Sequence, residues 1–230
     1  MATCTREPTV EQGHPLVLIA IEGIGGVGKT TLADRLEKWL KTRRLSIVRT
    51  KEPGGTRLGL ALREILLTKG GKVPMTDALL FAADRAQTYS EVIRPALEKG
   101  KIVISDRNLY GLIAYQGFGF GLPLEVLDEL NRLACQGVYP DLILVLDAPP
   151  TLARRRIAAQ DVDRFDRLGS EFQSRVRAGY LYAAKRDPEI AHVIDASAPL
   201  EDVVRSASQL LSARLRITQR PSNRPDHAAR

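Results

Sequence analysis

The feature that most restricts the fold is a glycine-rich octet, residues 23–30, placed between an apolar run and a helical pattern. It reads Gly-Ile-Gly-Gly-Val-Gly-Lys-Thr and comes after the apolar run Leu16–Ile21. Glycines let backbone N–H groups converge on an anion where a β-carbon would intrude, and the following helix directs its positive N-terminal end at that anion. The octet therefore predicts a phosphate-binding strand-loop-helix unit.

The same octet fits two kinds of nucleotide site. Through Gly23, Gly25 and Gly28 it matches a dinucleotide-binding pattern, for which Glu52 could supply the ribose-binding acid. Lys29 and Thr30 favour a nucleoside triphosphate instead, because the lysine reaches the β- and γ-phosphates and the threonine a Mg²⁺ ion. We expect ATP as the ligand. The predicted ATP-binding residues are Gly23, Ile24, Gly25, Gly26, Val27, Gly28, Lys29, Thr30 and Thr31.

Composition indicates an ordinary globular protein with a basic end. The chain has 230 residues, of which 44% are apolar, and a net charge of +7. We expect a flexible leader over residues 1–14, one domain over residues 15–212 and a disordered tail over residues 213–230. The tail holds five arginines and one aspartate, so it contributes +4 of that charge. A solvated end explains this better than a nucleic-acid partner.

The cysteines and the apolar segments suggest a cytoplasmic protein. Cys4 and Cys135 form no C-x-x-C pair and no zinc pattern with histidines, so we expect both to be reduced. No segment approaches the roughly 20 apolar residues that cross a bilayer. We therefore expect no membrane association.

Short β-branched runs alternate with longer helical patterns. The predicted strands are Leu16–Ile21, Leu45–Thr50, Ile102–Ser105, Leu142–Leu146 and Val193–Ile194. The predicted helices are Lys29–Lys41, Thr56–Leu67, Thr76–Lys99, Leu124–Cys135, Thr151–Ala159, Ser170–Lys185 and Leu200–Leu215. This order predicts an α/β fold with a five-stranded parallel sheet, helices on both faces and a site at the carboxyl ends of the strands.

Several charged residues follow these predicted strand ends. Asp106 is placed to hold the water shell of Mg²⁺, although a helix cap is its alternative, and Arg107 is adjacent. The segment Glu52-Pro53-Gly54-Gly55 would face the glycine loop as part of an acceptor site. Asp147 is placed either to cap a helix or to join the site.

Two further groups suggest phosphoryl transfer between nucleotides. Arginines cluster around a presumed lid at residues 157–167, where Arg164 is the candidate catalytic cation and Arg154 and Arg155 are expected surface charges. Phe81 and Arg85 lie four residues apart on one helical face, where they could hold a base between an aromatic plane and a planar cation.

Together these segments resemble the thymidylate kinase family, from about Leu16 to Val204. The resemblance rests on the glycine loop, residues 51–56, residues 80–85, Ser105-Asp106-Arg107 with Ala114-Tyr115-Gln116-Gly117, residues 140–147, and Asp163-Arg164-Phe165-Asp166. It implies a nucleoside monophosphate kinase fold and transfer of the γ-phosphoryl group of ATP to dTMP, with Mg²⁺ as cofactor and a homodimer as the assembly.

The resemblance also implies individual roles. Phe81 would stack on the base, Arg85 would bond its edge and Arg107 would grip the acceptor phosphate. Tyr115 and Gln116 would line the nucleoside pocket, beside Glu52 and Pro53. Arg164 would act from the lid, because the glycine loop lacks an arginine of its own and this is the bacterial pattern.

The chain departs from the family pattern where substrate identity is read. The family usually has an acidic residue that contacts the sugar 3′-hydroxyl at the position of Gly25, an aromatic residue or histidine at Asn108 and a small polar residue at Gly111. Phe120 lies in a run that often carries an arginine. These departures leave open another nucleoside monophosphate, or a deoxynucleoside hydroxyl with Glu52 as base, as the acceptor. A non-catalytic nucleotide-binding protein is a further alternative.

Overall fold

A computed structural model describes residues 17–68, 72–158 and 162–218. The predicted leader, Cys4 and the end of the predicted tail lie outside the described residues. Within them, a five-stranded sheet has the order β2-β3-β1-β4-β5, and every pair of neighbouring strands is parallel. The strands are β1 Leu18–Glu22, β2 Ile47–Lys51, β3 Ile102–Asp106, β4 Leu142–Asp147 and β5 Ala191–Asp195. The predicted parallel sheet is confirmed.

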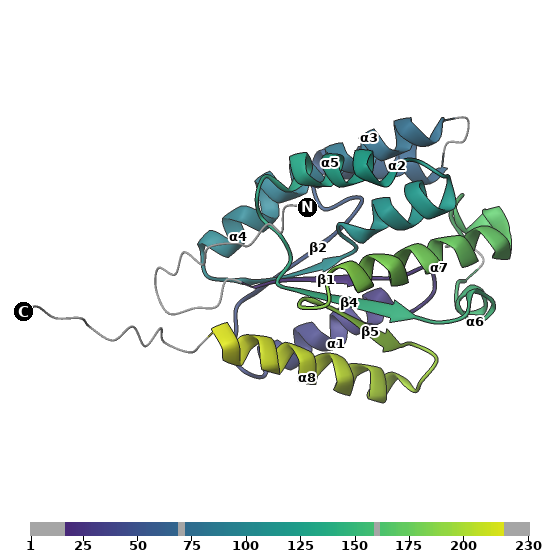
Figure 1. Ribbon diagram of the computed structural model, residues 1–230. Coiled ribbons are helices and arrows are strands. Elements are labelled where there is room, and N and C mark those ends of the chain that lie inside the picture. Colours follow the sequence, from purple (N-terminus) through teal and green to yellow (C-terminus); the bar gives the residue numbers. More distant parts are fainter. Residues whose placement is uncertain (1–16, 69–71, 159–161, 219–230) are drawn as a thin grey trace, which may run out of the picture.

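Helices cover both faces of this sheet (Figure 1). One face carries α1 and α8, which pack on each other, and the other carries α3, α4, α5 and α7. The helices are α1 Lys29–Lys41, α2 Arg57–Thr68, α3 Pro74–Thr88, α4 Arg94–Glu98, α5 Leu124–Cys135, α6 Pro150–Arg155, α7 Gly169–Arg186 and α8 Leu200–Thr218. Helix α8 continues past Ala213, where the tail was expected to begin.

The central strands are fully buried because they are apolar on both sides. Strands β1 and β4 read Leu-Ile-Ala-Ile-Glu and Leu-Ile-Leu-Val-Leu-Asp, which suits strands sandwiched between two helical layers. Helix α1 adds an apolar stripe through Leu32, Leu36 and Leu40, spaced one helical turn apart. This packing fixes the strand ends from which the site is built.

The predicted helix Thr76–Lys99 is interrupted. After α3, a π-helical turn at Tyr89–Ile93 precedes α4. The cause is Pro95, which has no N–H to donate and whose ring would collide with the carbonyl four residues earlier in a regular α-helix. The wider turn accommodates the proline and keeps Tyr89 and Ile93 buried.

A second π-helix, Leu112–Gly119, was not expected from the sequence because glycines disfavour helix interiors. It packs against α5 and α7, and its glycines provide the clearance. A β-carbon on Gly119 would lie 2.8 Å from the ring of Phe172 on α7. Close packing therefore stabilises a helix that local propensity opposes.

Candidate active site

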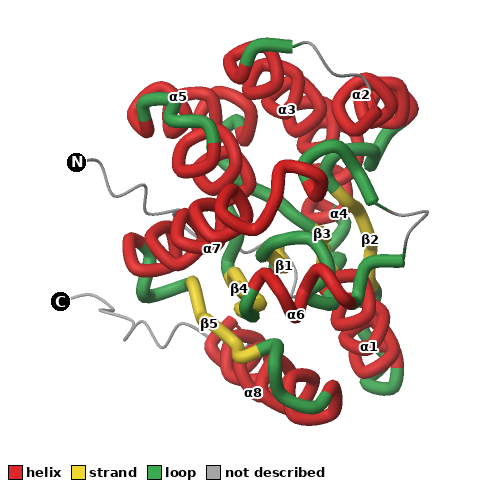
Figure 2. Tube along the Cα trace, turned by 90° about the vertical axis from the view of Figure 1, so that its right-hand side faces the viewer, coloured by secondary structure: helices red, strands yellow, loops and turns green. Residues whose placement is uncertain are grey.

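The glycine loop follows β1 and ends at the first turn of α1, as predicted. Figure 2 looks onto the carboxyl ends of the strands, where this loop lies. Gly28 precedes the helix with φ at 94°, a left-handed conformation that suits glycine. The N-terminal turn of α1 therefore faces the space above the sheet, where its unpaired N–H groups can bind an anion.

Lys29 is held inside this loop. Its Nζ donates to the carbonyl of Ile24 at 2.7 Å, and the side chain is buried. Burial, and after it the positive charge of Arg107, lower the pKa of Lys29 to about 7. Bound phosphates would reverse this effect because they stabilise the charged form.

The predicted metal ligands lie together. Thr30 Oγ1 donates to Asp106 Oδ2 at 2.6 Å, although the two residues come from α1 and β3. Strand β3 pairs with β1 in a register that places Asp106 beside Ile21, just before the glycine loop. The described residues contain no group of three or more histidines, cysteines or acids placed to share a metal. A hydroxyl and one carboxylate suit Mg²⁺, which keeps several waters and takes its other ligands from phosphates.

Arg107 turns back over the glycine loop because of its backbone. Its φ is 71°, a conformation that is uncommon for a residue with a β-carbon. Nη1 donates to the carbonyl of Gly23 at 2.9 Å and to the hydroxyl of Tyr180 at 2.7 Å. Nη2 donates to the hydroxyl of Tyr115 at 3.4 Å. The guanidinium thus lies next to the loop that would hold the other anion.

The two residues of the predicted base-binding pair lie in different environments. Phe81 and Arg85 both line a pocket at the carboxyl ends of the strands, but Arg85 is buried and bound by protein groups. Its Nε donates to Glu52 Oε2 at 2.8 Å, and its Nη atoms donate to Asn131 Oδ1 and to the carbonyl of Asn108. In this structure each nitrogen of the guanidinium donates to a protein acceptor in the wall of the pocket.

Glu52 is bound on both oxygens. Oε2 accepts from Arg85, and Oε1 accepts from the Asn108 amide at 3.3 Å. Burial raises the pKa of Glu52 to about 7, against the attraction of Arg85. Because neither oxygen is free of a protein donor, the arrangement favours a supporting role for Glu52 over that of a catalytic base.

Breaking this pair should be costly. Replacing Glu52 with alanine is expected to lower the free energy of unfolding by about 3–5 kcal/mol, because the charge of Arg85 stays buried without its partner. Urea denaturation measures the loss, and Glu52→Gln is the matched control that keeps one acceptor oxygen and the side-chain volume. A loss below about 1 kcal/mol for Glu52→Ala, the range of exposed pairs, would contradict the assigned pairing.

Tyr115 and Gln116 line the same pocket from the second π-helix. The Tyr115 ring packs edge-on against Phe165 with centroids 5.4 Å apart. Gln116 is almost fully buried, and its amide nitrogen has no hydrogen-bond partner among the described residues. Pro53 also lines the pocket, while its carbonyl accepts from Arg63.

One pocket of about 620 Å³ joins the predicted phosphate-binding and nucleoside-binding residues. Its lining includes Lys29, Thr30, Asp106 and Arg107 at one end and Phe81, Arg85, Tyr115 and Gln116 at the other. The pocket has a size suited to small-molecule ligands. Cations at one end and an aromatic surface at the other suit a ligand that carries both phosphate and a base.

Arg164 is not among the pocket-lining residues. Its guanidinium pairs with Asp77 of α3 and bonds the carbonyl of Leu66. It also stacks on its neighbour Phe165, with Cζ 4.1 Å from the ring centroid. The residues next to it do line the pocket, namely Asp163, Phe165 and Asp166. Part of the predicted lid, residues 159–161, lies outside the described residues.

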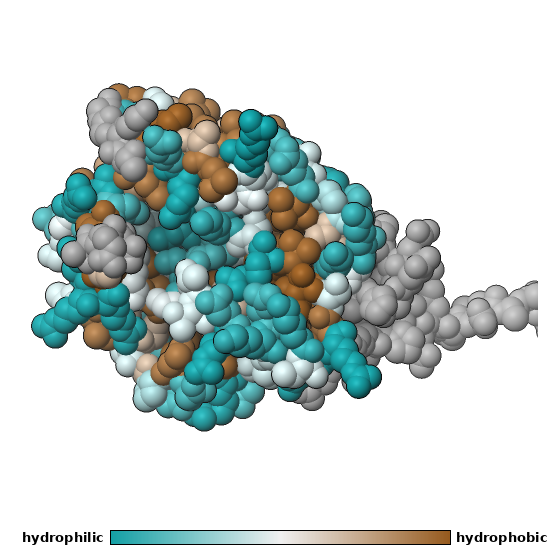
Figure 3. All heavy atoms as spheres, turned by 180° about the vertical axis from the view of Figure 1, so that it is seen from behind, coloured by the Kyte–Doolittle hydropathy of each residue, from teal (hydrophilic) through white to brown (hydrophobic). Residues whose placement is uncertain are grey.

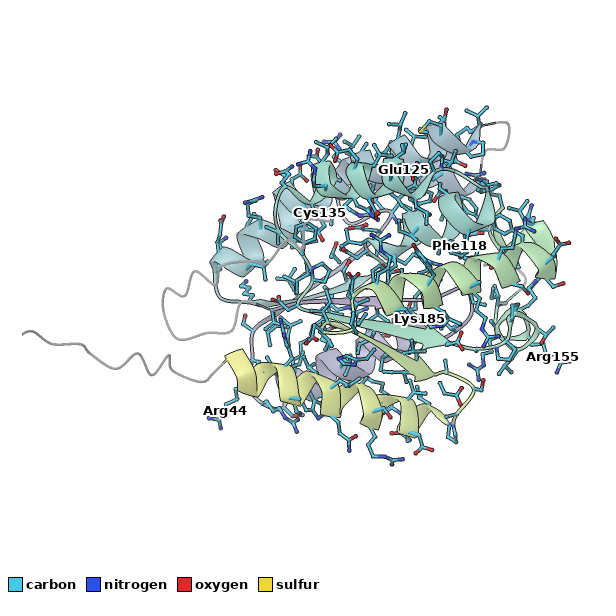
Figure 4. All side chains as sticks on the ribbon, viewed as in Figure 1. Arg44, Phe118, Glu125, Cys135, Arg155 and Lys185 are labelled. Atoms are coloured by element: carbon cyan, nitrogen blue, oxygen red, sulfur yellow. The ribbon has the colours of Figure 1, made fainter. Side chains whose placement is uncertain are left out.

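The structure also shows where the other charged residues that were singled out, Asp147, Arg154 and Arg155, lie. Asp147 neither caps α6, whose N-cap is Pro149, nor lines the pocket; it forms a bidentate pair with Arg177 of α7 at 2.7 Å. Arg154 and Arg155 are exposed on α6, as expected. Figure 4 shows Arg155 pointing away from the body of the molecule.

Two supporting residues were not singled out from the sequence. Glu22 ends β1, and its Oε1 accepts from the backbone N–H groups of Asn108 and Tyr110, both at 2.9 Å. Burial raises the pKa of Glu22. Tyr180, on α7, contacts Arg107 through its hydroxyl. An acidic residue that ends an apolar strand was the available signal for Glu22, whereas Tyr180 resembles any core position of a helix.

Comparisons with known proteins identify the family of this chain. The family model described as thymidylate kinase matches residues 21–207. A protein named thymidylate kinase from Leifsonia xyli is 45% identical over 199 residues, covering 85% of this chain and 94% of that protein. One with the same name from Pelotomaculum thermopropionicum is 44% identical over 210 residues, covering 88% and 97%.

A solved structure extends the agreement to the fold. The crystal structure of thymidylate kinase from Ehrlichia chaffeensis superposes with a TM-score of 0.71 at 32% identity, covering 85% of this chain and 98% of that one. These matches exclude the dinucleotide alternative. With a family model that spans most of the sequence and relatives at this identity, the chain belongs to the thymidylate kinase family.

Proposed function

We propose that the protein transfers the γ-phosphoryl group of ATP to dTMP, giving dTDP. The observation that carries the proposal is the hydrogen bond from Arg107 to the glycine loop at Gly23, which puts an acceptor-binding cation against the donor site within one pocket. The names of the relatives support dTMP as the acceptor.

The proposed reaction is an in-line attack by an acceptor phosphate oxygen on the γ-phosphorus of ATP. A phosphate monoester with a second pKa of about 6 is largely ionised at neutral pH, so no strong base is needed. Lys29 and Arg107 would position the phosphates and offset the charge that develops between them. Thr30 and Asp106 would hold Mg²⁺, which supplies further charge neutralisation when bound.

A screen of acceptors tests the proposal. ADP release from ATP would be measured with dTMP, thymidine and the other nucleoside monophosphates, each at the same concentration. We expect the highest kcat/KM with dTMP and none with thymidine, because both oxygens of Glu52 are engaged and no other base is assigned. Turnover of thymidine but not of dTMP would replace the proposal with a nucleoside kinase, and a different preferred monophosphate would replace the substrate alone.

The catalytic role of Arg164 stays a prediction, based on the family resemblance. If its guanidinium leaves Asp77 to stabilise the transferring group, Arg164→Ala is expected to lower kcat by about 10³-fold or more, well beyond any effect of the stability that it loses together with the buried Asp77 pair. Asp77→Asn is the matched control, because it weakens the same ion pair and keeps the arginine. Equal, small losses of activity in both variants, with equal losses of stability, would show that Arg164 serves only to anchor the chain at α3.

We also propose that the protein is a homodimer in the cytoplasm. Exposed apolar side chains support the assembly: Leu58 and Leu60 on α2, Leu79 on α3 and Leu133 on α5 are about half exposed or more. Figure 3 shows apolar atoms along the upper edge of the molecule, where α2 and α3 lie. In the described part of the chain, no helix combines the length and the apolar character needed to cross a membrane. Sedimentation velocity on the full chain would test the dimer.

A further inference from the structure

Position 25 favours glycine because there is no room for a β-carbon, and not because of its backbone conformation. Gly23, Gly26 and Gly28 of the same loop have positive φ values, but Gly25 does not. A β-carbon on residue 25 would collide with Oδ1 of Asp166 and would come within 3.3 Å of Ile157. Any other residue at this position would therefore displace the Asp166 carboxylate from the glycine loop.

The carboxylate of Asp166 is held in a fixed orientation. Its Oδ2 accepts from the backbone N–H of Asp163 at 3.2 Å, and its own N–H donates to Asp163 Oδ1 at 2.9 Å. Asp163 Oδ1 also accepts from Phe165 N at 2.8 Å. Across the described residues, no donor is bound to Asp166 Oδ1, the oxygen that faces Gly25. One oxygen anchors the side chain, which leaves the other for a ligand.

The position of Asp166 lies between the two ends of the pocket. Its neighbour Phe165 packs against Phe81 and Tyr115 on the nucleoside side, with centroids 6.0 and 5.4 Å apart. Asp166 itself lies against the glycine loop, where the charges of Lys29 and Arg107 act on it. A sugar joins base to phosphate in a nucleotide, so we expect the sugar of a nucleotide that spans this pocket to lie near the Asp166 carboxylate.

The chemistry of the carboxylate restricts what it binds. An ionised carboxylate accepts hydrogen bonds or coordinates a cation, and it repels phosphate oxygens, so an organic ligand must present a hydrogen-bond donor to it. Burial, and after it the charge of Asp163, raise the pKa of Asp166, while Arg107 and Lys29 act in the opposite direction. The sugar hydroxyl is the neutral donor of a nucleotide at this level, and dTMP has one free sugar hydroxyl, at C3′.

We propose that Asp166 helps bind the acceptor nucleotide by accepting a hydrogen bond from its 3′-hydroxyl, and that Gly25 provides the space for this carboxylate. This inference rests on the proposed function, because it takes the pocket to hold a nucleoside monophosphate. It assigns a ligand contact to the residue next to the aromatic anchor Phe165, instead of to a side chain of the glycine loop itself.

Binding calorimetry tests this proposal independently of turnover. Dissociation constants would be measured for dTMP and for its 3′-deoxy analogue, with wild type, Asp166→Ala and Gly25→Ala. A hydrogen bond to a charged group contributes about 1.5–3 kcal/mol, which corresponds to a loss of about 10- to 150-fold. We expect both variants to lose this factor for dTMP and to bind the 3′-deoxy analogue as wild type does, within about two-fold.

Gly25→Ala keeps Asp166 and only displaces it, so it separates the contact from any effect of Asp166→Ala on folding. Glu171→Ala, at an exposed position of α7, is the matched control. Equal losses for both ligands, no loss for dTMP, or no binding of dTMP by wild type would each overturn the proposal. Tight binding of dTMP without turnover would instead overturn the proposed function and leave the test of Asp166 valid.

Discussion

Replacing Arg107 with alanine is expected to lower kcat/KM for the acceptor by about 10³-fold, because the guanidinium would bind the acceptor phosphate in the ground state and offset charge in the transition state. Steady-state kinetics with varied dTMP at saturating ATP measure the effect. We expect a change in the KM for ATP smaller than the change in kcat, since Arg107 contacts the donor loop only through the carbonyl of Gly23.

Two matched variants make this prediction specific. Arg107→Lys keeps the charge but loses the planar fork that reaches Gly23, Tyr180 and Tyr115, so it should recover only a small part of the activity. Arg132→Ala removes an exposed arginine of α5 and should leave the kinetics unchanged. Full activity in Arg107→Lys would show that charge alone is needed, and full activity in Arg107→Ala would refute the assigned role.

Replacing Lys29 with methionine is expected to lower kcat by about 10²–10³-fold with the fold intact, because the cation acts on charge that develops during transfer. Methionine keeps most of the side-chain volume, which matters at a position that is almost completely buried. Circular dichroism and urea denaturation would check the fold, and ADP release would measure turnover. Unchanged turnover would rule out a role for Lys29 in the reaction.

Lys29 also predicts how ATP affinity depends on pH. With a pKa of about 7 in the ligand-free protein, Lys29 is charged below neutral pH and loses its proton as the pH rises. Bound phosphates stabilise the charged form, so ATP binding should take up a proton and weaken as the pH rises through 7. Calorimetry at pH 8 in buffers of different ionisation enthalpy measures this uptake, and Lys29→Met should abolish it.

The strands and the glycine loop were predictable because their causes are local. Buried parallel strands need continuous apolar runs, and β1 and β4 have them. A phosphate loop needs glycines before a helix, and residues 23–30 supply them. The edge strand β5 was predicted too short, at Val193–Ile194, because the polar residues His192 and Asp195 flank this apolar pair.

Side-chain partners could not be predicted in the same way. Arg85 was expected to hold a base with Phe81 from their spacing, and to bond the base edge from the family resemblance; the structure gives it Glu52, Asn131 and the Asn108 carbonyl as partners. These residues are far apart in the sequence, and no local pattern reports which charges meet. Asp147 illustrates the same point, since its position after a strand suggested a cap or a site residue and its partner is Arg177 on another helix.

By itself, the sequence determined the succession of most strands and helices along the chain, the phosphate loop and the family. Each of these depends on residues that are close together along the chain. Only the tertiary structure decided which side chains share the pocket. It brought the Asp166 carboxylate against Gly25, turned Arg164 toward Asp77 and stabilised a glycine-containing helix at Leu112–Gly119. Those outcomes depend on volume and charge between segments distant in sequence, which packing brings together.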